Sequence, residues 1–337
     1  MEVARRKEGL FSWSDVVRLA KLLTGSLVAA LIPRRYDDSA AELLLRFYPA
    51  ARPVKIAELA ATMADALSAR RSGNWQALAE EHARMAVEDS WGRFRGIGQP
   101  GRWRPTIEFS GESHVREALE RGRGAVIWCM RFSSDTVLKQ AFHQMGLPLV
   151  HLSLAEHGAW GSRTKLGTSV ISPLFTRAEN PYLADRVIIP PSSSLRYLQR
   201  LREHLRTNAC VSIFGDRTGR QRLEVPFLNG CRKFATGAPS LAWIENCALL
   251  SAYVIRTGVF QYRVVIEKQI PVDRSLNRKE FLKRAVGEFA QRTEELVERY
   301  PSDWQEWADW KRSQLDVTKL SGFADAENIG ARSHQRS

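Results

Sequence analysis

Apolar residues recur along this chain at helical spacing up to about residue 88 and in short runs after residue 105. Between residues 38 and 88, apolar positions lie three and four apart, as at Ala41 and Leu44, which predicts helices. Prolines and a Ser-Gly-Asn turn at 72–74 interrupt this pattern, so we expect several helices rather than one. The segment 36–105 is therefore predicted to be a helical N-terminal region.

From residue 106 onward, short apolar runs alternate with segments of helical periodicity. That alternation is typical of a sheet whose two faces are both covered by helices. The predicted fold class is α/β, with a mixed sheet over residues 106–323, followed by a disordered tail at 324–337. The expected strands are 106–109, 125–130, 149–152, 187–189, 209–214, 249–255 and 262–266, and the expected helices are 112–121, 136–145, 194–206, 239–246 and 278–300.

The first 35 residues combine an apolar stretch with basic residues on both sides. The uncharged part, 22–32, is shorter than the roughly 20 residues that cross a bilayer. We expect residues 1–35 to provide a membrane-associating helix that lies in the interface, with Arg18 and Lys21 reaching the headgroups. A helix packed on the protein's own core is an equally open alternative.

The overall charge points to anionic partners. Lys and Arg number 50 against 37 acidic residues, a formal charge of +13, which suits an anionic membrane surface or an acidic protein or substrate. No zinc-finger spacing or RNA-recognition signature is present, so nucleic acid is not expected as a partner. The four cysteines are widely spaced, which predicts buried free thiols, and neither a metal site nor a cofactor is expected.

Three groups of motifs follow one another in a defined order. The first is a glycine turn at 121–124 that leads into the apolar run 125–130. The second joins Phe-Gly-Asp-Arg at 214–217 to Phe-Leu-Asn-Gly at 227–230 and Thr-Gly-Ala-Pro-Ser-Leu-Ala at 236–242, and the third is Tyr-Pro-Ser-Asp-Trp-Gln-Glu-Trp at 300–307. In this order they resemble the bacterial lipid A biosynthesis acyltransferases of the lauroyl and myristoyl type, within the lysophospholipid acyltransferase superfamily.

This resemblance implies acyl transfer from an acyl-carrier protein or acyl-CoA to a hydroxyl of a lipid or glycolipid. It places the protein at the cytoplasmic face of the bacterial inner membrane, peripheral or anchored by its N-terminus. In the family a histidine deprotonates the acceptor, and an acid five residues later orients it. Aligned on the glycine turn, those positions are Arg131 and Thr136. A guanidinium has no lone pair with which to accept a proton, so this pair cannot act in the usual way.

Other residues near this position could replace the missing base. Asp135 is one, although an ion pair with Arg131 at a helix start, structural or anion-binding, is the preferred interpretation. His151 and Glu156 repeat the family's spacing twenty residues downstream, but about one such match is expected by chance in this composition. His143 is expected at the surface or in packing.

The remaining polar motifs have structural alternatives. Ser133 and Ser134 are expected to cap the helix that follows them. The tryptophans at 304, 307 and 310 are expected to pack in the core, with a membrane-interface belt as the alternative. The resemblance suggests substrate contacts, against the alternative of a polar loop, at Asp216, Arg217, Arg220, Arg222, Asn229 and Gly230.

The sequence therefore supports two hypotheses. The protein is either an acyltransferase with a rearranged or lost catalytic base, or an inactive relative that binds acyl chains or an acyl-carrier protein.

Overall fold

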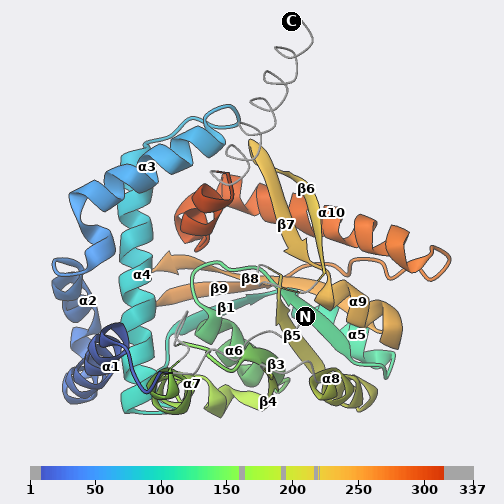
Figure 1. Ribbon diagram of the computed structural model, residues 1–337, viewed down its shortest axis with the longest axis horizontal. Helices are drawn as coiled ribbons and strands as arrows, with labels where there is room; N and C mark the ends of the chain where they lie inside the picture. Colours follow the sequence, from blue (N-terminus) through green and yellow to red (C-terminus); the bar gives the residue numbers. More distant parts are fainter. Residues whose placement is uncertain (1–8, 159–163, 191–194, 216–218, 220, 315–337) are drawn as a thin grey trace, which may run out of the picture.

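The computed structural model describes residues 9–158, 164–190, 195–215, 219 and 221–314 of the chain. Its centre is a seven-stranded sheet in the order β1-β9-β8-β2-β5-β3-β4, in which only β8 and β9 pair antiparallel (Figure 1). The predicted mixed sheet is thus confirmed. The strands are β1 Thr106–Ser110, β2 Ala125–Cys129, β3 Leu149–Leu154, β4 Leu183–Ile189, β5 Cys210–Phe214, β8 Ala248–Gly258 and β9 Gln261–Ile266.

Helices cover both faces of this sheet because its central strands are apolar on both sides. In β2, Val126 and Trp128 enter one core cluster, while Ala125 and Ile127 enter the other. The first cluster is covered by α8 Arg196–Arg206, α9 Gly237–Glu245 and α10 Arg278–Arg299, and the second by α5 Glu112–Glu120 and α6 Asp135–Gln144. The helices and strands predicted after residue 105 are all present, with small differences at their ends.

The N-terminal region consists of α1 Trp13–Leu31, α2 Asp37–Leu45, α3 Pro53–Leu67 and α4 Trp75–Gly98, and the first three pack on α4. The predicted break at 72–74 is confirmed, because Asn74 caps α4 by accepting the Ala77 N–H at 3.1 Å. Unexpectedly, α4 continues through Gly92 and Gly96. Their missing side chains let Trp103 and Ala178 pack directly against the helix.

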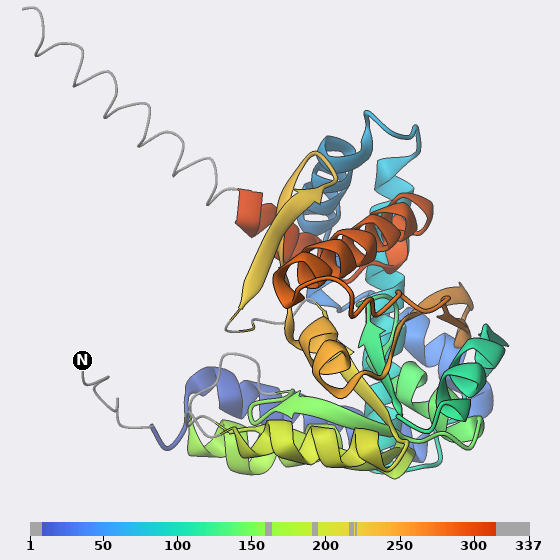
Figure 2. The ribbon, with the colours of Figure 1, turned by 90° about the vertical axis from the view of Figure 1, so that its right-hand side faces the viewer.

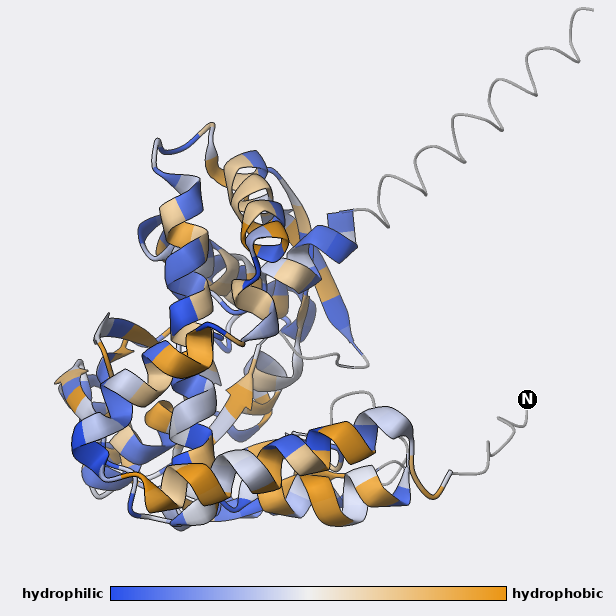
Figure 3. Ribbon diagram, turned by 90° about the vertical axis from the view of Figure 1, so that its left-hand side faces the viewer, coloured by the Kyte–Doolittle hydropathy of each residue, from blue (hydrophilic) through white to orange (hydrophobic). Residues whose placement is uncertain are grey.

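Helix α1 has one packed side and one exposed side. Leu22 lies in a small core cluster with Ile171 and Phe175, which belong to η3 Gly167–Ile171 and α7 Ser172–Thr176. Leu23, Leu27 and Leu31, in contrast, are exposed on the outward side (Figure 3). The packed side fits the alternative of a helix on the protein's own core, and the exposed leucines leave membrane association as a prediction.

Among the described residues, no single helix has the length and hydropathy to cross a membrane. The segments 13–31 and 34–45 reach that threshold only together, and the chain bends by 115° between them. Residues 1–8 of the expected anchor and the predicted tail at 324–337 lie outside the described residues.

A two-stranded hairpin, β6 Arg222–Phe227 and β7 Gly230–Ala235, was not predicted. It lies beside α10 (Figure 2). Its Phe227 packs against Trp304 and Trp310, and Trp304, Trp307 and Trp310 are all buried, which confirms core packing. The prediction of buried cysteines needs one correction, because Cys231 faces solvent on β7. Side chains alternate between the two faces of β7, so Cys231 is exposed on one face while its neighbour Arg232 is buried on the other.

Candidate active site

A cavity of about 610 Å³ lies at the carboxyl ends of β3, β4 and β5. Leu154, Ile189 and Phe214, the last residues of these parallel strands, line it. Leucines of α8 and α9 enclose the other sides, so the wall is mainly apolar. Ligands of α/β proteins bind at this end of the sheet, in pockets of about this size. Its polar lining residues include His151, Ser153, His157, Arg202, Thr236 and Arg278.

His151 points from β3 into this cavity beside Ser153, two residues further along the same face of the strand. Its Nδ1 lies 2.9 Å from the Ser212 Oγ, and its ring meets Phe214 edge-on. Burial, together with the charges of Lys139 and Arg186, holds the pKa of His151 well below its usual value. His151 is therefore a neutral imidazole at physiological pH.

His157, in the turn after β3, is paired with a carboxylate. Its Nε2 lies 3.1 Å from Oε1 of Glu179, which comes from the turn between α7 and β4. His157 is 5% exposed and Glu179 is 2% exposed. The ring of Phe175 meets the His157 ring edge-on at 5.4 Å and fixes its orientation.

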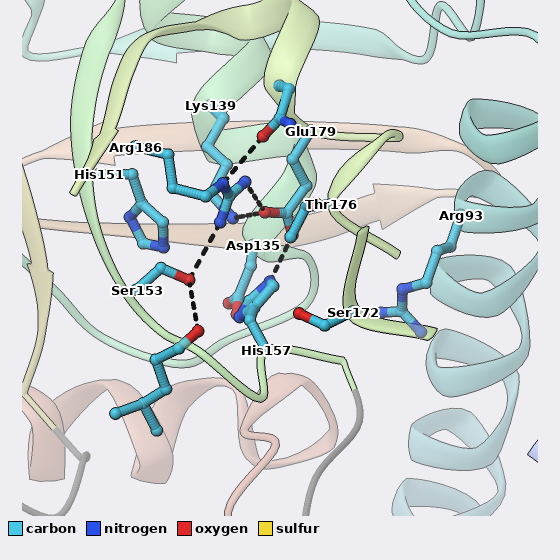
Figure 4. Close-up of polar contacts among 12 residues, drawn as sticks. Arg93, Asp135, Lys139, His151, Ser153, His157, Ser172, Thr176, Glu179 and Arg186 are labelled. Atoms are coloured by element: carbon cyan, nitrogen blue, oxygen red, sulfur yellow. Dashed lines mark hydrogen bonds and ion pairs between the residues drawn. The ribbon is translucent and has the colours of Figure 1, made fainter. Parts of the chain in front are cut away.

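Glu179 also holds two buried or nearly buried cations (Figure 4). Its Oε2 lies 2.7 Å from the Lys139 Nζ and 2.7 Å from an Arg186 guanidinium nitrogen. Arg186 in turn donates to the Ser153 Oγ at 3.1 Å, which links the cluster to the cavity wall. We call Lys139, His157, Glu179 and Arg186 the Glu179 cluster.

The charges of the Glu179 cluster are strongly coupled. Burial opposes ionisation of Glu179, but Lys139, His157 and Arg186 outweigh it and hold the pKa of this carboxyl well below its usual range. Burial also lowers the pKa of Lys139, which Glu179 and Asp135 partly offset. The pKa of His157 is lowered too, because burial exceeds the opposing effect of Glu179. His157 is thus neutral near pH 7 beside an ionised carboxylate.

The positions aligned with the family's catalytic pair lie next to this cluster. An Arg131 guanidinium nitrogen lies 3.6 Å from Asp135 Oδ2, so the expected ion pair is present at the start of α6. Asp135 precedes Lys139 by one helical turn, and the two charges interact. Thr136 is buried. Neither Arg131 nor Thr136 supplies a group that can accept a proton from a hydroxyl.

The His151–Glu156 spacing does not form a pair in space. Within the described residues, no hydrogen bond or ion pair joins the two side chains, and His151 is engaged by Ser212 instead. β3 ends at Leu154, so Glu156 lies in the turn after the strand that carries His151, and the spacing does not bring the two side chains together. His143 lies on the exposed side of α6, edge-on to Tyr182.

The prediction that a serine hydroxyl caps the start of α6 by a hydrogen bond is wrong. Ser134 occupies the N-cap position, but its hydroxyl donates to Asp89 Oδ1 at 2.7 Å rather than accepting an amide of the helix. The Asp89 carboxylate of α4 is a stronger acceptor for this hydroxyl, and the hydrogen bond connects the start of α6 to the N-terminal helical region.

The expected substrate-binding residues divide into three groups. Arg222 begins β6 and donates to the Gly219 carbonyl, and its neighbour Gln221 lines the cavity. Asn229 and Gly230, however, form the far turn of the hairpin, where Asn229 Nδ2 donates to the Asp65 carbonyl of α3 at 2.9 Å. The cavity therefore does not include them, because the hairpin carries its turn toward α3. Asp216, Arg217 and Arg220 lie outside the described residues.

The sequence analysis missed His157, Glu179, Lys139 and Arg186. His157 and Glu179 are separated by 22 residues, and no motif has that spacing. They meet because the chain leaves β3 and returns to the adjacent strand β4. The one available signal was the position of His157 just after the apolar strand 149–152. Among the described residues, no three His, Cys, Asp or Glu side chains are placed to share a metal ion.

No family model and no curated protein matches the chain. Among solved structures, it is similar to the 1-acyl-sn-glycerophosphate (LPA) acyltransferase PlsC from Thermotoga maritima, with a TM-score of 0.34 and 10% sequence identity. The likeness covers 84% of this chain and 98% of that chain. The proposals below therefore rest on the residues of this chain.

Proposed function

We propose that the protein transfers an acyl chain from a thioester donor to a hydroxyl of a lipid acceptor at a membrane surface. The observation that carries this proposal is the cavity of about 610 Å³ with histidines on one part of an otherwise mainly apolar wall. A long hydrocarbon chain is the ligand that fits such a wall, because it needs no hydrogen-bonding partners along its length. The motif resemblance to lipid A acyltransferases supports the same substrate classes.

The lining suggests how the donor lies. Leu198, Leu201 and Leu241 of α8 and α9 provide contacts for the hydrocarbon, and His151 and His157 provide the polar part, suited to the thioester. Arg202 and Arg278 also line the cavity, and both are cations that suit the phosphates of coenzyme A or an acidic acyl-carrier protein. The formal charge of +13 favours either donor.

The second hypothesis is a protein that holds an acyl chain without transferring it. It is favoured by one observation, the presence of Arg131 and Thr136 where the family has its histidine and acid. Both hypotheses require acyl binding in the cavity, and only the first requires turnover.

Filling the cavity tests acyl binding directly. We expect Leu198→Trp to weaken binding of a fluorescent long-chain fatty acyl probe by about tenfold or more, because the indole occupies the space of several methylene groups. The matched control is Leu282→Trp on α10. Leu282 is, like Leu198, a partly buried leucine packed on the same core cluster, but it does not line the cavity. Equal affinities of the two variants and the wild type would place the acyl chain elsewhere.

The outward side of α1 supports the membrane part of the proposal. Trp13, Leu23, Leu27 and Leu31 are exposed there, and Leu43 and Phe47 extend exposed apolar surface into the α2 segment. An exposed apolar patch of this kind marks an interaction site. Exposed cations accompany it at Lys21, Arg34, Arg35, Arg46 and Arg52. A bilayer with anionic headgroups matches both features, and we place it at the cytoplasmic face of a bacterial inner membrane.

Vesicle binding tests this surface. Leu27→Asp should reduce partitioning onto phosphatidylcholine–phosphatidylglycerol vesicles by about tenfold or more, since it removes a leucine's burial and adds a charge. Phe109→Asp, at an exposed apolar position on the edge strand β1, is the charge-matched control and should bind like the wild type. If both variants lose binding equally, net charge and not α1 determines attachment.

A further inference from the structure

The chain has lost the base expected at position 131, yet a histidine–carboxylate pair lies in the wall of the cavity. His157 lines the cavity, and its Nε2 is 3.1 Å from Glu179 Oε1. This is the chemical pairing that general-base catalysis of acyl transfer requires: an imidazole oriented by a carboxylate that also stabilises the imidazolium.

The hydrogen bond to Glu179 determines which nitrogen can act. An ionised carboxylate only accepts hydrogen bonds, so His157 Nε2 carries the proton and Nδ1 carries the lone pair. The carboxylate itself is held by Lys139 and Arg186 at 2.7 Å each. Phe175 restricts the ring on its other side. The pair is therefore preorganised for accepting a proton at Nδ1.

We propose that His157, oriented by Glu179, is the general base of this protein. The inference rests on the proposed acyl transfer and assigns its base to residues outside the family's motif.

In the reaction, the hydroxyl of the lipid acceptor donates its proton to His157 Nδ1 while its oxygen attacks the thioester carbonyl carbon. A C–O bond forms, and the carbonyl π electrons move to the oxygen of a tetrahedral intermediate. Collapse of that intermediate breaks the C–S bond, and the departing thiolate takes the proton from the imidazolium. The products are the acylated lipid and a free thiol, and His157 is neutral again.

The neighbouring candidates lack this combination. His151 lines the same cavity, but its Nδ1 contacts the Ser212 hydroxyl, and no carboxylate of the described residues is hydrogen-bonded to it. The charges of Lys139 and Arg186 oppose its imidazolium more strongly than the charge of Glu179 favours it. Asp135 is paired with Arg131, which favours its ionised and weakly basic form. Only His157 joins a cavity position to a carboxylate partner among these three.

The decisive experiment compares His157→Gln with His143→Gln in the full chain. The assay follows thiol release and lipid product from palmitoyl-coenzyme A with vesicles that contain 1-acyl-glycerophosphate or diacylglycerol, two lipids with a free hydroxyl. We expect His157→Gln to lower kcat by about 10²- to 10⁴-fold, with a much smaller effect on palmitoyl binding and KM. His143→Gln, on the exposed side of α6, should leave kcat unchanged.

Chemical rescue separates a base from a merely structural histidine. His157→Ala leaves space beside Glu179, so added imidazole should restore part of the lost turnover, and more as the neutral form of imidazole increases with pH. A structural defect would not follow the protonation of imidazole.

Full activity of His157→Gln overturns the inference. Wild-type protein that binds palmitoyl chains but forms no product overturns the proposed transfer together with the inference, and it leaves the acyl-binding hypothesis in place. Absence of both palmitoyl binding and turnover overturns both hypotheses for the cavity.

Discussion

Glu179→Gln is expected to lower the free energy of unfolding by about 3–5 kcal/mol, the usual cost of leaving a buried charge without its partner. Glu179 is the carboxylate that faces both Lys139, which is 1% exposed, and Arg186. The amide side chain keeps the shape but removes the negative charge. Chemical denaturation followed by tryptophan fluorescence measures this difference.

Two further variants check the cause. Glu108→Gln breaks an exposed ion pair with Arg263 and should cost less than about 1 kcal/mol. Adding Lys139→Met to Glu179→Gln should recover part of the stability, because it removes one of the two uncompensated cations. A Glu179→Gln protein as stable as Glu108→Gln would mean that the cluster is not charged in the folded state.

Acidification from pH 7 to about 5.5 should also destabilise the protein, because the folded chain holds His151 and His157 in their neutral forms. Burial lowers the folded-state pKa of both below the ordinary value of 6.5. In the unfolded chain both take up protons as the pH falls through 6.5, while in the folded chain they remain neutral. The stability that the two neutral histidines contribute is therefore fully present above pH 6.5. It decreases as the pH falls from 6.5 toward their folded-state pKa values.

The measurement is the free energy of unfolding at a series of pH values. His157→Gln should reduce the pH dependence. His82 also contributes to it, because burial lowers its pKa, whereas Asp303, whose pKa burial raises to about 6, acts in the opposite direction. Charged neighbours set the size of the effect: Lys139 and Arg186 oppose protonation of both histidines, and Glu179 favours it. If the wild type and His157→Gln had the same pH dependence, the pKa of His157 would not be lowered in the folded protein.

Most of the sheet could be predicted because burial on both faces produces an uninterrupted apolar run. Residues 125–129 are apolar throughout and form β2 at the centre of the sheet. The β6–β7 hairpin escaped prediction for the opposite reason. Its inward side includes Arg232, which is buried by an ion pair with Glu306 and by the rings of Phe227 and Trp304. A charged residue on the buried side conceals the alternation that identifies a strand.

The site was harder to predict than the fold, because its pairing is made by tertiary structure. The residue types at Arg131 and Thr136 predict that they cannot act as an ordinary catalytic pair. The spacing of His151 and Glu156 suggested a second pair, but Glu156 lies in the turn beyond β3 and does not contact His151. Nothing in the sequence connects His157 to Glu179, since the turn after β3 and the turn before β4 meet only when the strands pair. Parallel strands regularly bring together residues that are distant along the chain, so such a site becomes visible only in three dimensions.

The inner side of α1 makes the first helix an unsuitable place to shorten the chain. Leu22 packs with Ile171 and Phe175, and the buried Asp15 accepts a hydrogen bond from Thr164 at 2.8 Å. Phe175 is also the residue that restricts the His157 ring. Deleting residues before 32 would remove Leu22, which packs with Phe175. Phe175 would then restrict the His157 ring less. A protein that retains α1 is therefore the better material for testing the proposed activity.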